Sequence, residues 1–127
     1  TANLKSELMS QNCQPGDFLI VQIESGVGLL RILGIDESGN DKIWHLAAFN
    51  ELFLDPESAD AALASPETLT INIAHVALTQ RAFEATQTAR MTNRDLLPDD
   101  LIGLEKWRGG QSMEVSDRSI RLMLGWR

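Results

Sequence analysis

The stretch PGDFLIVQIESGVGLLRILGI, residues 15–35, decides the fold, because two apolar runs lie on either side of a short link that contains glycine. The first run begins after Gly16 and is rich in the side chains that favour strands, up to the polar residues Glu24 and Ser25. The second run is followed by Asp-Glu-Ser-Gly-Asn, residues 36–40, in which Asp, Ser, Gly and Asn are frequent in turns. We therefore predict two antiparallel strands joined as a hairpin.

A third strand follows directly in DKIWHLAAF, residues 41–49, where Trp44 and Leu46 alternate with Ile43, His45 and Ala47. The region from 17 to 49 is thus predicted to be a three-stranded antiparallel meander. Three strands are about the minimum for a stable sheet, and an open edge invites pairing with other chains. We therefore expect a small, partly open barrel or a strongly bent sheet.

Two short helices accompany these strands in the prediction. In LDPESADAALASPE, Asp55 is suited to cap a helix, Pro56 to its first position and Glu57 to its positive end, which predicts a helix over 56–64. In DLLPDDLIGLEKWRGG, leucines recur at helical spacing before two glycines, which predicts a helix over 98–107.

The remaining segments complete the predicted class, α+β and mainly β, with two or three short helices. TLTINIAHVAL, residues 68–78, alternates as a strand, with a bulge or the end of pairing near His75. Residues 79–86 fit a helical turn capped by Thr79 and residues 87–93 fit a strand, but periodicity does not separate the two. SIRLMLGWR, residues 119–127, alternates in a way that predicts a closing strand. We expect one domain over 1–127, in which 1–14 is an N-terminal extension or a short helix.

Charge and composition exclude several classes of function. Eleven basic against eighteen acidic side chains give a net charge of −7, which disfavours nucleic acid as a partner and favours a basic protein surface. No apolar run approaches the roughly 20 residues that cross a bilayer, so we expect no membrane association and a cytoplasmic location. The oligomeric state does not follow from the sequence.

No signature of catalysis, metal binding or cofactor binding is recognised in the chain. The single cysteine, Cys13, lies in a polar segment and is interpreted as an inert thiol. His45 and His75 each fall in a predicted strand and are interpreted as hydrogen-bonded sheet residues rather than as a catalytic pair. Asp99 and Asp100 are neighbours that point about 100° apart on a helix, where they complement the helix dipole. We therefore predict a protein that is not an enzyme and holds neither metal nor cofactor.

The order of PGDFLIVQI, GLLRILGI, HVALTQRAF, TNRDLLPDDL and KW resembles the SH3-like barrel immunity proteins that bacteria encode beside polymorphic toxins. The resemblance extends over roughly residues 15–108 as a pattern of strands and turns. Its most specific part is Gly-Asp before an apolar strand, followed by a second strand that contains Arg31. The resemblance implies an SH3-like barrel that binds and neutralises a toxin.

Two hypotheses of function remain. The first is a non-enzymatic protein-binding module, an immunity protein whose acidic surface meets a basic partner such as a toxin. The second is a small-ligand-binding or regulatory domain whose site lies at the barrel mouth. Trp44 and Trp126 are interpreted as core residues. For contact with a partner, the candidates are Asp55, Glu57, Asp60, Asp99, Asp100, Glu105 and Trp107.

Overall fold

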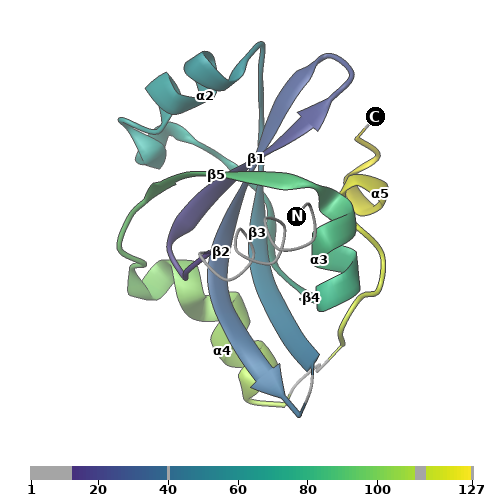
Figure 1. The fold of residues 1–127 in the computed structure, drawn as a ribbon. Coiled ribbons are helices and arrows are strands. Elements are labelled where there is room, and N and C mark those ends of the chain that lie inside the picture. Colours follow the sequence, from purple (N-terminus) through teal and green to yellow (C-terminus); the bar gives the residue numbers. More distant parts are fainter. Residues whose placement is uncertain (1–12, 40, 111–113, 127) are drawn as a thin grey trace.

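The computed structural model describes residues 13–39, 41–110 and 114–126 (Figure 1). Most of the predicted N-terminal extension, residues 1–12, lies outside the described residues. Five strands form one antiparallel sheet in the order β4-β3-β2-β1-β5. Their bounds are β1 Asp17–Ile23, β2 Gly26–Ser38, β3 Asp41–Phe53, β4 Ile71–Thr79 and β5 Thr88–Asn93.

The predicted meander from 17 to 49 is confirmed. β1 pairs with β2, and β2 with β3, both antiparallel. Only Glu24 and Ser25 separate β1 from β2. Gly26 then enters β2 with a φ of +149°, and it lies against the carbonyl of Phe53, so no side chain fits at this position.

The sheet is strongly bent, and its connections require the bend. The outermost strands, β4 and β5, are joined by a single helix, α3 Gln80–Thr86. A flat sheet of five strands would separate its outer strands by about 19 Å, whereas a helix of seven residues spans about 10 Å. The sheet therefore curls until α3 bridges the gap, and β5 crosses in front of the long strands in Figure 1. This fold confirms the predicted α+β, mainly β class.

The predicted irregularity near His75 is a bulge. Leu46 pairs with Val76 and Ala48 with Ile73, so one residue of β3 stands opposite two residues of β4. The strand does not end there but continues to Thr79. The bulge changes the pairing register between β3 and β4, and with it which side chains of β4 lie beside those of β3 on the same face of the sheet.

The predicted helices are confirmed, with small differences at their ends. The first is α2 Pro56–Ala62, followed by the 3-10 turn η1 Pro66–Thr68. The second is a 3-10 turn, η2 Pro98–Leu101, that continues as α4 Ile102–Arg108. Periodicity did not separate helix from strand over residues 79–93, and the structure has both there, α3 and then β5. Thr79 caps α3, because its hydroxyl accepts a hydrogen bond from the Ala82 amide.

The predicted closing strand over 119–127 is wrong, because Ile120–Leu124 is a short helix, α5. Ile120 and Leu124 lie four residues apart, a spacing that also fits one face of a helix, and both pack against the core. The edge of β4 that a closing strand would use is instead occupied by Ser116, which exchanges backbone hydrogen bonds with Ala77 and Thr79. Gly125 ends the helix in the left-handed conformation.

The core lies on both faces of the β1–β2 hairpin. One face packs against α3 and α5, through a cluster that includes Leu19, Leu30 and Phe83. The opposite face carries Phe18 and Leu29, which cluster with Phe49 of β3 and with Ala59 and Leu63 at α2. The apolar runs of residues 17–35 alternate poorly because both sides of their strands are buried.

Candidate functional site

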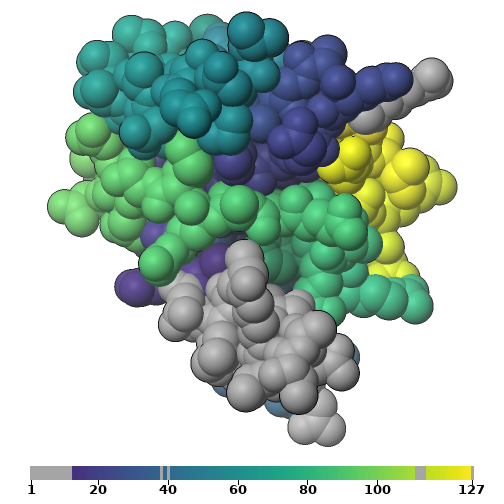
Figure 2. Space-filling view, turned by 45° about the horizontal axis from the view of Figure 1, so that its top comes forward, coloured from purple at the N-terminus to yellow at the C-terminus, as the bar shows by residue number. Residues whose placement is uncertain are grey.

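A groove of about 710 Å³ lies between η1 and the segment that links β5 to η2. In Figure 2 the teal residues of α2 and η1 lie directly beside the green residues that follow β5. We call this feature the acidic groove, because its wall has four acidic but only two basic side chains. Its residues are Arg31, Pro66, Glu67, Asn93, Arg94, Asp95, Leu97, Asp99 and Asp100.

Arg31 fixes one wall of the acidic groove to the sheet. It is only 8% exposed and projects from β2, with its guanidinium 4.6 Å from the centre of the Phe18 ring. Its terminal nitrogens donate to Asp100 Oδ2 at 3.2 Å and to the carbonyl oxygens of Arg94 and Asp95 at 2.8 and 3.1 Å. Burial lowers the pKa of Arg31, and the charge of Asp100 opposes that shift. The pair therefore holds the link in place and leaves Asp100 little freedom to meet a partner.

The other three carboxylates of the groove are exposed and form no ion pair within the described residues. They belong to Glu67, Asp95 and Asp99. Leu97 lies among them and is 63% exposed, one of the most exposed large apolar side chains in the described part of the chain. An apolar centre with a charged rim is the usual anatomy of a surface that binds protein.

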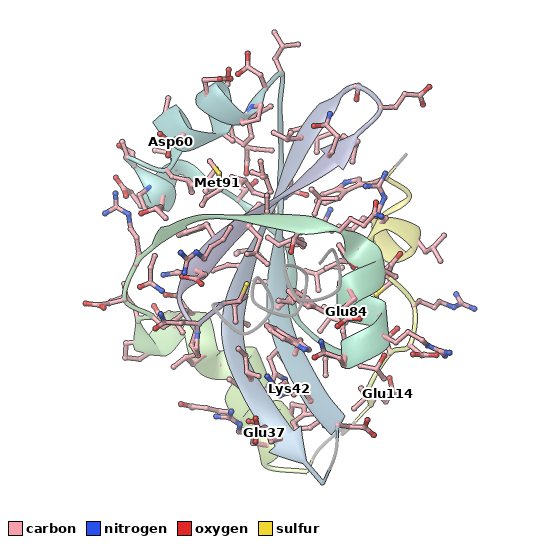
Figure 3. All side chains as sticks on the ribbon, in the orientation of Figure 1. Glu37, Lys42, Asp60, Glu84, Met91 and Glu114 are labelled. Atoms are coloured by element: carbon pink, nitrogen blue, oxygen red, sulfur yellow. The ribbon has the colours of Figure 1, made fainter. Side chains whose placement is uncertain are left out.

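The structure separates the residues that we predicted for partner contact into three places. Asp99 and Asp100 line the acidic groove. Asp55, Glu57 and Asp60 belong to α2 or its cap, and Asp55 accepts the Ser58 amide, which lowers the pKa of Asp55. Figure 3 shows Asp60 at the end of the molecule far from Glu37 and Lys42.

The last two predicted residues lie on α4. The Glu105 side chain is exposed. Trp107 is 9% exposed and donates from Nε1 to the carbonyl of Glu114. Its indole lies with its edge toward His45, at 4.6 Å between ring centres. Trp107 is therefore part of the wall of a second pocket and not an exposed anchor at the acidic groove.

Four side chains form a hydrogen-bonded chain, and the last of them, His75, lines this second pocket. Arg108 donates to Asp36 Oδ1 at 2.5 Å, and Asp36 Oδ2 lies 3.0 Å from Nε2 of His45. Nδ1 of His45 lies 2.9 Å from Nε2 of His75. The two histidines are thus hydrogen-bonded sheet residues, as predicted, and they bond to each other. The sequence indicated an irregularity near His75 but not which residues of β3 pair with β4, so it did not bring the two histidines together.

Both histidines are neutral near pH 7. Burial lowers the pKa of His45, which is 0% exposed, although Asp36 opposes that shift. Burial, then the charges of His45 and Arg108, lowers the pKa of His75 to about 4. Asp36 stays ionised because the hydrogen bond from Arg108 lowers its pKa.

The second pocket has a volume of about 370 Å³ and lies beside β4 and α4. We call it the histidine pocket. It is lined by His75, Val76, Ala77, Gly103, Lys106, Trp107, Glu114, Ser116 and Met123.

Cys13 lies apart from both features. It is partly buried and packs against the core cluster that contains Leu19 and Trp44. Burial, then the charge of Asp17, raises the pKa of its thiol. A raised pKa leaves little thiolate at neutral pH, so the local chemistry does not activate Cys13 as a nucleophile.

Within residues 13–39, 41–110 and 114–126 no three His, Cys, Asp or Glu side chains form a group able to hold a metal ion. The helices in these ranges are too short or too polar to cross a bilayer. Comparison of the chain with protein-family models, with curated proteins and with solved structures finds no match. The site is therefore interpreted from its own geometry.

Proposed function

We propose that this protein is a non-enzymatic binding module that receives a basic protein partner in the acidic groove. The observation that carries the proposal is the set of three exposed carboxylates without ion pairs, Glu67, Asp95 and Asp99, around the exposed side chain of Leu97. Unpaired carboxylates attract lysine and arginine side chains, and an exposed leucine supplies apolar area to the centre of an interface.

The charge of the whole chain supports the same partner. A net charge of −7 repels acidic proteins and nucleic acids and raises the rate at which basic proteins are encountered. The groove adds a local site to this general attraction. A basic segment with an apolar side chain between its cations fits the arrangement of Leu97 and the neighbouring carboxylates.

The partner that we propose is a toxin, which makes the protein an immunity protein. The resemblance of residues 15–108 to SH3-like barrel immunity proteins supports this step. An immunity protein acts by occupying the surface of its toxin, so it requires complementary charge and shape but no catalytic residue. The acidic groove supplies the negative charge that a basic toxin surface requires.

The experiment is a pull-down from the source organism with three forms of the full chain. The groove variant is Asp95→Lys with Asp99→Lys, which spares Asp100 because Asp100 is bonded to Arg31. The matched control is Glu57→Lys with Asp60→Lys, which makes the same change in net charge on α2, outside the groove. We expect wild type and the α2 variant to retain one basic protein that the groove variant loses.

The captured protein is then expressed in a host cell, with and without this chain. A toxin arrests growth when expressed alone, and coexpression of the wild-type chain restores growth, whereas coexpression of the groove variant does not. Equal retention of the partner by the groove variant contradicts the assignment of the groove. A partner whose expression leaves growth unchanged contradicts the immunity function.

A further inference from the structure

We infer that the histidine pocket is a second binding site, for a small neutral aromatic molecule that carries an O–H or N–H group and donates it to Nδ1 of His75. This site is independent of the acidic groove, because the two sets of lining residues share no member. The inference rests on the hydrogen-bond chain behind His75, on the lining of the pocket and on the packing that holds the ring.

The hydrogen-bond chain determines which nitrogen of each ring carries the proton. An ionised carboxylate only accepts, so Nε2 of His45 donates to Asp36. Nδ1 of the neutral His45 therefore accepts, and Nε2 of His75 donates to it. The remaining nitrogen of His75, Nδ1, has a lone pair and no proton.

This lone pair is available to a ligand at the pocket wall. Within the described residues no protein group bonds to Nδ1 of His75. Among the described residues, Nε of Arg31 is the only buried side-chain nitrogen or oxygen atom without a hydrogen-bond partner. Nδ1 of His75 also has no partner but does not belong to that class, so it is not buried. Because His75 lines the pocket, a molecule inside it meets an acceptor with a fixed direction.

The lining selects an uncharged, apolar body for that molecule. Val76, Ala77 and Met123 supply aliphatic contacts, and Trp107 supplies an aromatic one. The charged side chains at the rim, Lys106 and Glu114, are of opposite sign and give the pocket no net charge. A volume of about 370 Å³ lies at the lower end of the range for small-molecule sites.

Close packing keeps the His75 ring in place before any ligand arrives. A Cβ atom at Gly103 would lie 2.6 Å from Cβ of His75, so the backbone of α4 rests directly against this residue. The hydrogen bond to Nδ1 of His45 also holds the ring, and the two ring planes lie within 19° of parallel. A ligand therefore spends little free energy on ordering the acceptor.

The test uses NMR spectroscopy of the full chain with nitrogen-15 in its histidines. Long-range proton–nitrogen spectra at pH 7 report which ring nitrogens carry protons. We expect Nε2 to be protonated in both histidines and Nδ1 to be bare in both. A proton on Nδ1 of His75 overturns the inference, and this result depends on no variant.

Phenol and toluene are then the two probes, because they share a shape and differ in the O–H donor. We expect phenol to bind about 3- to 10-fold more tightly than toluene, the factor that one net hydrogen bond supplies, and to shift the Nδ1 signal of His75. Equal affinity for the two probes, or binding of neither, overturns the inference.

The His75→Phe variant keeps a planar ring and removes the acceptor, so the preference for phenol should disappear. Asn72→Ala is the matched control, an exposed position on the same strand outside the pocket, where the preference should persist. A His75→Phe chain that retains the preference overturns the inference. If that variant fails to fold, the nitrogen signals of the wild-type chain with phenol and with toluene still decide.

Discussion

At the scale of single residues, Arg31 is a charged strand residue that is buried rather than solvated. Its guanidinium ties β2 to the segment after β5 through one carboxylate and two carbonyl groups. A buried hydrogen bond to a charged group stabilises a protein by about 1.5–3 kcal/mol. The segment that carries Asp95 and Asp99 therefore depends on Arg31 for its position.

We expect Arg31→Met to lower the free energy of unfolding by about 2–4 kcal/mol, because it removes one of the donors to Asp100 and the donor to the carbonyl groups of Arg94 and Asp95. Urea denaturation followed by circular dichroism measures this change. Arg118→Met is the control, since Arg118 is exposed and its side chain bonds to no group that the structure describes; it should change stability by less than about 0.5 kcal/mol. A loss of less than about 1 kcal/mol for Arg31→Met would contradict the role of Arg31 in holding the segment after β5 to the sheet.

The histidine pair makes stability depend on pH. Histidines in the unfolded chain titrate near pH 6.5, whereas the pKa of His75 in the folded protein is about 4. Between these values the unfolded chain binds more protons, so stability is fully present above pH 6.5 and falls as pH is lowered toward 4. We expect His75 to account for about 1–2 kcal/mol of lost stability at pH 4.5, after solvent screening is allowed for.

The measurement is the free energy of unfolding at pH 7 and at pH 4.5, for wild type and for His75→Gln. Carboxylates also titrate in this range, so the difference between the two proteins isolates the histidine. The variant should lose less stability on acidification than wild type does. Equal slopes would show that His75 titrates normally in the folded protein.

At the scale of elements, α3 is the connection that closes the bent sheet. Thr79 stands at the junction of β4 and α3, where its hydroxyl accepts the Ala82 amide at 3.1 Å and donates to Asp117 at 2.7 Å. The same residue pairs with Ser116 through its backbone. One side chain thus links the end of a strand, the start of a helix and the segment that covers the sheet edge.

Thr79→Ala should lower the melting temperature, because loss of an N-cap costs about 1–2 kcal/mol and Asp117 also loses a donor. Thr79→Ser keeps the hydroxyl and should retain most of the stability. Thermal unfolding monitored by circular dichroism compares the two variants. If both melt at the same temperature, the hydroxyl is not the stabilising group at this junction.

At the scale of the whole molecule, the proposed function assigns net charge and the acidic groove to different stages of binding a basic partner. Net charge acts over distances up to the Debye length, about 8 Å at physiological ionic strength. The groove acts after contact, when Leu97 and its neighbouring carboxylates are covered. Added salt weakens the contribution of net charge, whereas the contribution of the groove depends on which residues are substituted, so the two can be measured separately.

With a purified partner, we expect Asp95→Lys with Asp99→Lys to slow association by about tenfold at low salt, because both charges face the partner. Stopped-flow fluorescence measures the association rate at several salt concentrations. The α2 variant Glu57→Lys with Asp60→Lys should slow association less and leave the dissociation rate unchanged. Equal effects of the two variants would assign binding to net charge alone and not to the groove.

Much of the fold was predictable, because local chemistry specified it. The turn residues 36–40 and the apolar runs before and after the link at residues 24–28 predicted the hairpins, and Asp55 with Pro56 predicted the start of α2. The segment 119–127 was predicted wrongly, since Ile120 and Leu124 fit a strand or a helix equally well by spacing. Its conformation depends on the edge of β4, which Ser116 already occupies.

The sequence alone determined the class of the fold, the excess of acidic side chains and the lack of any recognised catalytic motif, because these depend on composition and on spacing along the chain. The tertiary structure alone decided that Asp99 shares a groove with Glu67, that Asp100 is bonded to Arg31 and that His45 meets His75. Each of these pairs joins residues far apart in the sequence. Their distances are set by the degree of curl of the sheet and by the pairing register on either side of the bulge in β4, whereas the local pattern of residues indicated only that the sheet bends and that pairing is irregular near His75.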